Sequence, residues 1–288
     1  MAGTVGAALL GLRDRLRGVV RHVGRDRADL TRDFAETSQA SARALSRGDR
    51  DGPDRVKWLT GTTIDGQPIR FRPRQVWSKP LKDAHGKRIG ATFIKDEAHA
   101  REILWWAKQE TREADTEVRP SLQGLLQRGL YQPPEDAPWA DAVRKSGEPP
   151  NFFFAHADTD NAHVSVNEGS KLFPRWVEAT LDKSQVGPML RAVKNSARAF
   201  KRNGAGEQVL VMCESGAPGA SLGPTVSANL HSTGTVTGNI HAPTDYVYTP
   251  IPQDGTLDTW LGVQRPGSAG KLFETYEAPG NTLPPEGS

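Results

Sequence analysis

The sequence predicts an α/β protein: a three-layer α/β/α sandwich with a mostly parallel central sheet. Two short apolar runs carry most of this prediction, Asn151–Phe154 and Val209–Val211. Both are rich in aromatic or β-branched residues, and small and polar residues follow each of them, as is typical of buried strands. Helical patterns lie between and after these runs. Strands that alternate with helices indicate parallel pairing through crossover helices.

The composition indicates one core with long loops. Only 36% of the 288 residues are hydrophobic, and the chain contains 29 Gly and 21 Pro. A single Cys excludes an intrachain disulfide framework and a multi-cysteine zinc site. The net charge of +3 is small, and without a concentrated basic motif we expect no binding to nucleic acid. No apolar run reaches the roughly 18 residues of a membrane span. Since no signal peptide is recognisable either, we expect a cytoplasmic protein.

Three segments divide the chain. In residues 1–50, apolar residues recur at helical spacing between arginines, which predicts a basic amphipathic helix. Such a helix can bind a membrane surface or a partner, or pack against the rest of the chain. The main domain is predicted over residues 56–265, and the Pro- and Gly-rich residues 266–288 are predicted to form a tail.

The first half of the main domain begins with strands. Apolar and polar residues alternate in four predicted extended segments, 56–59, 69–71, 75–81 and 89–94. Asp65-Gly66 between the first two is a hairpin turn signal. Asp96 is a suitable N-cap for a helix that we expect to end near Arg112. A further helix is predicted around residues 122–130.

The second half is expected to alternate strands and helices. The apolar strand that ends at His156 is followed by a return strand over Asn161–Val166. Helical patterns predict three helices, over residues 172–181, 186–201 and 225–231. Residues 242–249 are predicted to be extended.

Cys213 and His156 are the candidate catalytic residues. Each follows an apolar strand, and the carboxyl ends of parallel strands meet at the edge where α/β proteins bind ligands. A thiolate nucleophile with an imidazole acid and base nearby is a combination that acyl transfer can use. Alternatively, Cys213 is a small buried hydrophobic residue, as most free cysteines are.

Acyl transfer also needs hydrogen-bond donors for the oxyanion. The backbone amides of Cys213 and Ala157 are the candidates, because small residues surround both positions. Alternative catalytic bases are His163, His231 and His241, of which His241 is the next candidate after His156. A metal site built from histidines with nearby aspartates lacks any recognised ligand spacing, so we predict neither metal nor cofactor.

The two strands that end in His156 and Cys213 resemble the caspase-type (clan CD) cysteine peptidases, in which the two residues are separated by a similar length of chain. The segment His241–Thr249 (HAPTDYVYT) is similar to one that follows the Cys in the "lonely Cys" domains of actinobacterial toxin-like proteins, relatives of the CHAT-domain peptidases. The resemblance covers roughly residues 56–265.

This resemblance implies a caspase-hemoglobinase-like fold and thiol endopeptidase activity without a cofactor. It also implies a protein or peptide substrate that binds as an extended strand. Five residues are predicted to bind substrate: Asp158, Asp160, Asp245, Tyr246 and Tyr248. The three aspartates can select a basic residue at the cleavage site, or be solvated loop acids.

The expected role is cleavage of a partner protein, or of the protein itself, in a bacterial toxin or defence system. The alternative is a catalytically inactive binding or scaffold module. Ala157 favours this alternative, because many relatives have Gly after the catalytic His and alanine does not readily adopt positive φ. A third alternative is a lipid- or partner-binding protein that acts through residues 1–50.

Overall fold

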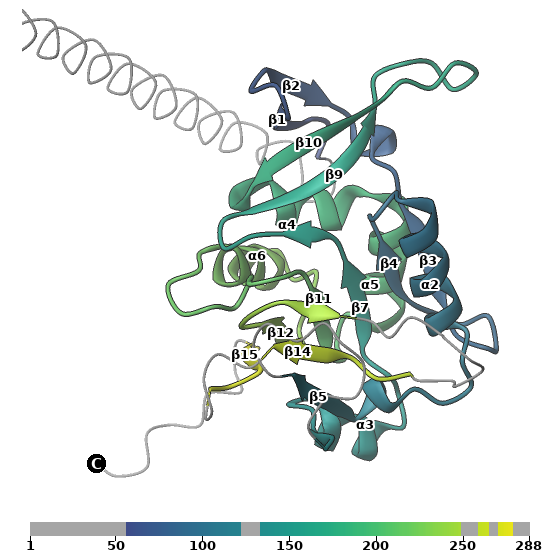
Figure 1. Ribbon diagram of the computed structural model, residues 1–288, viewed down its shortest axis with the longest axis vertical. Helices are drawn as coiled ribbons and strands as arrows, with labels where there is room; N and C mark the ends of the chain where they lie inside the picture. Colours follow the sequence, from purple (N-terminus) through teal and green to yellow (C-terminus); the bar gives the residue numbers. More distant parts are fainter. Residues whose placement is uncertain (1–55, 122–132, 249–258, 265–269, 279–288) are drawn as a thin grey trace, which may run out of the picture. The chain divides into compact units, whose positions relative to one another are not determined.

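The computed structural model describes residues 56–121, 133–248, 259–264 and 270–278 (Figure 1). All of them belong to one compact unit of the chain. The helices predicted within residues 1–50 and around residues 122–130 lie outside the described residues. In the described part, no helix is both long enough and apolar enough to cross a membrane.

A six-stranded mixed sheet contains both strands that we predicted to carry the catalytic residues. Its order is β15–β12–β11–β7–β4–β3. The strands are β3 (Lys79–Lys82), β4 (Arg88–Thr92), β7 (Asn151–Phe154), β11 (Gln208–Val211), β12 (Ile240–Pro243) and β15 (Phe273–Tyr276). The four inner strands are parallel, whereas β3 and β15 are antiparallel to their neighbours. Because β15 lies within residues 266–288, part of the predicted tail belongs to the sheet.

A second sheet is wholly antiparallel, in the order β2–β1–β10–β9–β8. Its strands are β1 (Leu59–Thr63), β2 (Pro68–Phe71), β8 (His156–Ala157), β9 (Asn161–Asn167) and β10 (Trp176–Asp182). The hairpin predicted at Asp65-Gly66 joins β1 to β2, with Gly66 at a φ of +77°. Only Ala155 separates β7 from β8, so the chain passes from one sheet into the other within a single residue.

A third sheet has the order β13–β14–β5–β6. Its strands are β5 (Glu117–Ser121), β6 (Glu135–Asp136), β13 (Val247–Tyr248) and β14 (Gly262–Gln264). β13 lies at one edge and pairs with β14 in the antiparallel sense.

Five α-helices and two short 3-10 helices lie in the described part. They are α2 (Glu97–Ala107), α3 (Ala140–Ser146), α4 (Lys183–Ala192), α5 (Lys194–Asn203), α6 (Leu222–Ser232), η2 (Pro73–Gln75) and η3 (Glu113–Asp115). Asp96 caps α2 as predicted, because its side chain accepts a hydrogen bond from the His99 amide at 2.9 Å. The helix predicted over residues 186–201 is two helices, since Val193 between them is extended, with φ −72° and ψ 127°.

The predicted three-layer sandwich around a mostly parallel sheet is wrong. That prediction used a helix over residues 172–181 as a crossover between parallel strands. The structure instead has an exposed loop there, followed by β10. Ala179 and Leu181 are buried while the residues between and beside them are less buried, which is the period-two pattern of a strand. With β10 paired to β1 and β9, antiparallel strand pairs make up much of the described fold.

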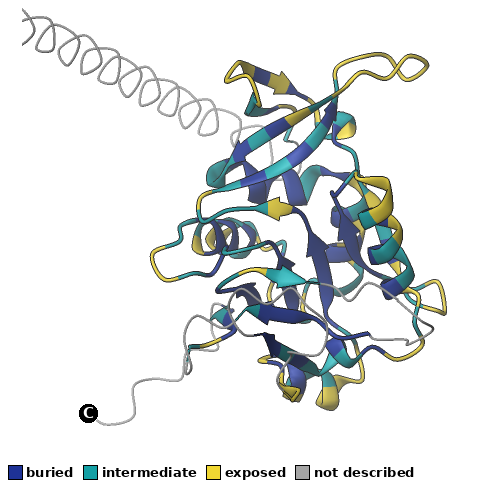
Figure 2. Ribbon diagram, viewed as in Figure 1, coloured by how far each residue is buried: buried dark blue, intermediate teal, exposed yellow. Residues whose placement is uncertain are grey.

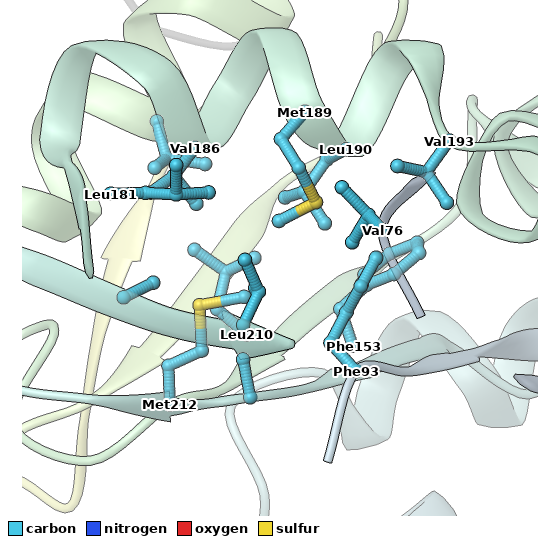
Figure 3. Close-up of a cluster of buried hydrophobic side chains, with 14 of the residues drawn as sticks. Val76, Phe93, Phe153, Leu181, Val186, Met189, Leu190, Val193, Leu210 and Met212 are labelled. Carbon is cyan, nitrogen blue, oxygen red and sulfur yellow. The ribbon is translucent and has the colours of Figure 1, made fainter. Parts of the chain in front are cut away.

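Each face of the six-stranded sheet contributes to its own hydrophobic core. Phe153, Leu210 and Met212 point to one face, where Met189 and Leu190 of α4 pack against them (Figure 3). The next residues along the same strands, Phe152, Phe154, Val209 and Val211, belong to the other core, with Trp106 and Trp139. Both central strands are therefore buried on both faces, dark blue in Figure 2. Such burial holds the ends of β7 and β11 in fixed positions.

We expect Phe153→Ala to lower the free energy of unfolding by about 3–5 kcal/mol, because it leaves a cavity in a fully buried core. Urea denaturation followed by circular dichroism measures the change. Leu172→Ala, at a side chain that is 84% exposed, is the control and should change stability by no more than about 0.5 kcal/mol. Equal stability of the two variants would contradict the packing described for Phe153.

Candidate active site

Cys213 and His156 occupy equivalent positions beyond two paired strands. β7 and β11 are parallel neighbours, with Phe154 opposite Val211. The pairing extends one residue further, because the Ala155 amide donates to the Val211 carbonyl at 3.3 Å. His156 lies two residues after Phe154, and Cys213 lies two residues after Val211. The structure therefore brings the two predicted catalytic residues to the same end of neighbouring strands.

The directions of the two side chains also agree. Side chains alternate between the faces of a strand, so residues two apart share a face. Phe154 and Val211 both belong to the core that contains Trp106. If the alternation continues beyond the strand ends, it predicts that His156 and Cys213 extend these two rows on that face. A nucleophile and its base need this common direction to come within hydrogen-bonding reach.

The chain turns sharply after Cys213. The Ser215 amide donates to the Met212 carbonyl at 3.3 Å and closes a four-residue turn. Within this turn, Glu214 has a φ of +56° and is the only non-glycine residue of the described part with a positive φ. An L-residue in this conformation costs roughly 1–2 kcal/mol. Strain of this kind is often found at functional sites.

The turn is bonded to the segment that follows β12. The amides of Glu214 and Gly216 donate to the carbonyls of Asp245 and Pro243 at 3.1 and 2.9 Å. A Cβ atom on Gly216 would lie 2.4 Å from the Ala242 carbonyl oxygen, so the close approach requires glycine. These two amides are therefore occupied and do not add to the predicted oxyanion donors.

Cys213 is a protonated thiol at rest. Burial raises the pKa of the Cys213 thiol above its ordinary value, and the negative charges of Glu214 and Asp245 raise it further. Hydrogen bonding to the backbone of Val247 and to the amide of Cys213 itself acts in the opposite direction. The Sγ atom lies 4.0 Å from the carbonyl oxygen of Val247 in β13.

His156 is held neutral by its surroundings. Part of the residue is exposed, but packing against the imidazole desolvates it and lowers its pKa below 6.5, and the neighbouring His99 lowers it further. The negative charge of Glu178 acts in the opposite direction. A neutral imidazole and a neutral thiol at the same end of neighbouring strands suit general-base catalysis rather than a preformed ion pair.

The sequence did not identify His99. Its ring centroid lies 5.5 Å from that of His156, with the two planes tilted by 50°. His99 lies in the first turn of α2, three residues after the Asp96 cap, so its place on the helix was predictable. The contact with His156 joins residues that are far apart in the sequence, and no local pattern signals it.

The Cys213 amide faces the strand that carries His156. The Val211 carbonyl accepts its hydrogen bond from Ala155, so the backbone polar groups of Val211 point toward β7. In an extended chain, the backbone polar groups of residues two apart point the same way. The Cys213 amide, two residues after Val211, is therefore also directed toward β7. Between described residues, this amide makes no hydrogen bond to another backbone carbonyl. Its hydrogen bond to the sulfur atom of the same residue would give way to an oxyanion at the point where the two strands separate.

The Ala157 amide faces the same gap from the other strand. The Asp158 amide donates to the Asn161 carbonyl at 3.0 Å, so these two residues form a hydrogen-bonded pair. Hydrogen-bonded and non-hydrogen-bonded pairs alternate along the antiparallel β8–β9 ladder from that position. Ala157, opposite Ala162, is then a non-bonded pair whose amide points away from β9. Ala157 has no positive φ. Alanine is therefore not strained at this position, and its effect on activity stays a prediction.

Two of the predicted substrate-binding acids stabilise a turn. The side chain of Asp158 accepts hydrogen bonds from the amides of Asp160 and Asn161, both at 2.8 Å. Asp160 accepts a hydrogen bond from the Ser221 hydroxyl at the start of α6 and lies 3.6 Å from the ammonium group of Lys183. The hydrogen bond from Ser221 lowers the pKa of Asp160. Both acids are thus engaged within the protein.

Asp245, Tyr246 and Tyr248 lie in or next to β13, which contains the contact with Cys213. Asp245 adds negative charge near the thiol, and Tyr246 is exposed. The Tyr248 hydroxyl lies 3.5 Å from a side-chain oxygen of Gln264. The Gln264 amide donates to the Tyr246 carbonyl, so these residues are a hydrogen-bonded pair of the β13–β14 ladder. The next pair is not hydrogen-bonded, and the amide and carbonyl of Val247 therefore point away from β14. This edge of β13 faces Cys213.

The other histidines lie elsewhere or have other partners. His241 is fully buried, pairs with Glu207 at 2.6 Å and is level with Val209, four residues before Cys213. It therefore does not belong to the site. His163 bonds to Thr180, and His231 bonds to the carbonyl of Gly238. Across the described residues, no group of three or more His, Cys, Asp or Glu side chains is arranged to hold a metal ion.

No family model matches the chain, and the comparisons found no similar curated protein or solved structure. The assignment of a site to Cys213 and His156 therefore depends on the geometry alone.

We expect Glu214→Gln to lower the pKa of Cys213, because it removes one of the charges that disfavour the thiolate. The rate of alkylation by iodoacetamide near neutral pH should then rise severalfold. A rate profile against pH measures the shift. The control is Asp141→Asn, which removes an exposed charge on α3. An unchanged profile for Glu214→Gln would show that this charge does not act on the thiol.

We expect His99→Gln to raise the pKa of His156 toward the ordinary histidine value, because it removes the electrostatic effect of His99 that lowers this pKa. NMR titration of the imidazole Cε1 protons measures the pKa of His156 in the folded native chain and in the folded variant. His85→Gln, in the exposed turn between β3 and β4, should leave His156 unchanged. If both variants leave the titration of His156 as it is in the native chain, the contact with His99 has no electrostatic effect.

Proposed function

We propose that this protein is a cysteine endopeptidase, with Cys213 as nucleophile and His156 as general acid and base, that cleaves a partner protein or itself. The observation that carries the proposal is the register of β7 and β11. It gives the two residues equivalent positions just beyond neighbouring strands, and side-chain alternation predicts a common face for them. A role in a bacterial toxin or defence system stays a prediction of the sequence resemblance.

The resting protonation states support a general-base mechanism. As Sγ of Cys213 attacks the peptide carbonyl carbon, neutral His156 accepts the thiol proton. The tetrahedral intermediate collapses when the C–N bond breaks, and His156 returns the proton to the leaving amine. A water molecule, deprotonated by His156, then attacks the thioester and releases the acid and the free thiol. The amides of Cys213 and Ala157 are the proposed donors to the oxyanion at both stages.

The edge of β13 that faces Cys213 supports the binding of an extended substrate, which would replace the thiol as the partner of Val247. The amide and carbonyl of Val247 point away from β14. A peptide strand that pairs with them would lie beside Cys213, because the Val247 carbonyl is itself 4.0 Å from Sγ. Tyr246, exposed next to this edge, is a suitable contact for a substrate side chain.

One observation favours a second candidate, an inactive peptide-binding module. Burial, Glu214 and Asp245 all raise the pKa of the Cys213 thiol, which disfavours nucleophilic attack. Such a module would use the same edge of β13 to bind extended peptides without cleaving them. The two candidates therefore differ in turnover and share the binding surface.

The full chain should cleave members of a peptide library, and new N-termini identified by mass spectrometry measure the cleavage. Cys213→Ala should abolish it, and His156→Ala should lower the rate by about 10²–10⁴-fold. The control is His85→Ala, in an exposed turn. Because the pKa of His156 is lowered, the rate should halve only at a pH below about 6.5. Intact mass measured over time reports self-cleavage.

Peptides that bind the native chain but stay intact would select the binding module instead. Cleavage that survives both Cys213→Ala and His156→Ala would overturn the proposed dyad.

A further inference from the structure

The loop that joins β9 to β10, Glu168–Arg175, exposes two adjacent apolar side chains. Leu172 is 84% exposed and Phe173 is 81% exposed. The loop projects from the end of the hairpin, away from the rest of the described fold (Figure 1). Isolated apolar side chains on a surface are ordinary, whereas two large ones together on a projecting tip indicate contact with an apolar partner.

The loop has a defined conformation. The side-chain oxygen of Asn167 accepts hydrogen bonds from the amides of Gly169 and Arg175, both at 2.9 Å. The Phe173 amide donates to the hydroxyl of Ser170 at 3.0 Å. A Cβ atom on Gly169 would lie 2.2 Å from the Phe173 carbonyl oxygen, so the tip closes tightly over glycine. This internal bonding fixes the tip before any partner arrives, which lowers the entropic cost of binding.

Basic residues lie within the loop and near its base. Lys171 and Arg175 lie within the loop, where Arg175 pairs with Glu168. Exposed Arg74 precedes Gln75, whose side chain donates to the Asn167 carbonyl at 2.8 Å at the base of the loop.

An aromatic residue with a cation over its ring lies next to the loop. Trp176, the first residue of β10, is 37% exposed, and the Lys95 ammonium lies 5.4 Å from the centre of its ring. Lys171 and Arg175 thus lie in the loop, and Arg74 and Lys95 lie near its base, together with the acids Glu168 and Glu178.

We propose that the β9–β10 loop docks on the surface of an anionic lipid bilayer. Leu172 and Phe173 enter the interface between headgroups and acyl chains, and Trp176 lies at the level of the headgroups, where its amphipathic ring is favoured. The basic residues contact lipid phosphates. A convex tip suits a deformable surface, whereas a protein partner would need a matching pocket. This proposal is independent of the chemistry of Cys213.

The test is co-sedimentation of the full chain with phosphatidylcholine vesicles, with and without phosphatidylserine. Native protein should bind the vesicles that contain phosphatidylserine. The double variant Leu172→Ser/Phe173→Ser should weaken binding by about tenfold or more, because it removes the two apolar side chains that enter the bilayer. Ile64→Ser is the matched control: Ile64 is 82% exposed at another hairpin turn, beside the acidic Asp65, and its loss should leave binding unchanged.

Circular dichroism establishes that the variants are folded. Residues 1–50 are identical in all of them, so equal binding by the native chain and the double variant would assign the membrane contact to another part of the chain and overturn the proposal. Absence of native binding would also overturn it. If the double variant instead abolished self-association in analytical ultracentrifugation, the tip would be a protein contact.

Discussion

The parallel pairing of β7 with β11 is the constraint on which the rest of the site depends. These strands are buried on both faces, so neither can shift by one residue without moving its side chains into the wrong core. The last bond of the pair, from Ala155 to Val211, also ends the sheet at that point. Beyond it the two chains separate, one into a second sheet and one into a turn. His156 and Cys213 are the second residues after the end of each strand.

Separation of the strands explains why the amides of Cys213 and Ala157 make no hydrogen bond to a neighbouring strand in the described part of the chain. Within a sheet, backbone amides are used by the neighbouring strand, and in a helix by the preceding turn. Where β7 becomes β8, the polar groups of Ala157 face away from β9, and the turn after Met212 directs its own bonds to other carbonyls. A gap with donors on both sides is the arrangement that a developing negative charge requires. The strain at Glu214 belongs to the same turn.

Local patterns in the sequence predicted the elements whose signals are local. The Asp65-Gly66 hairpin, the Asp96 cap and both catalytic strands follow from neighbouring residues. β10 was mistaken for a helix because Trp176–Asp182 is short and suits both patterns, and its pairing with β9 decides the outcome. β15 lies in a Pro- and Gly-rich segment, so composition concealed it. The contact of His99 with His156 depends on the tertiary fold, as does the burial of His241.

The turn between β8 and β9 links the two halves of the site from outside. The Thr159 carbonyl accepts bonds from the amides of Ser221 and Leu222 at 3.0 and 2.9 Å, and Asp160 accepts from the Ser221 hydroxyl. These hydrogen bonds hold the segment that follows Cys213 to the segment that follows His156. Sequence change at Asp160 can therefore alter the spacing between His156 and Cys213 through the backbone. Natural variation at this position would then report on the alignment of these two residues.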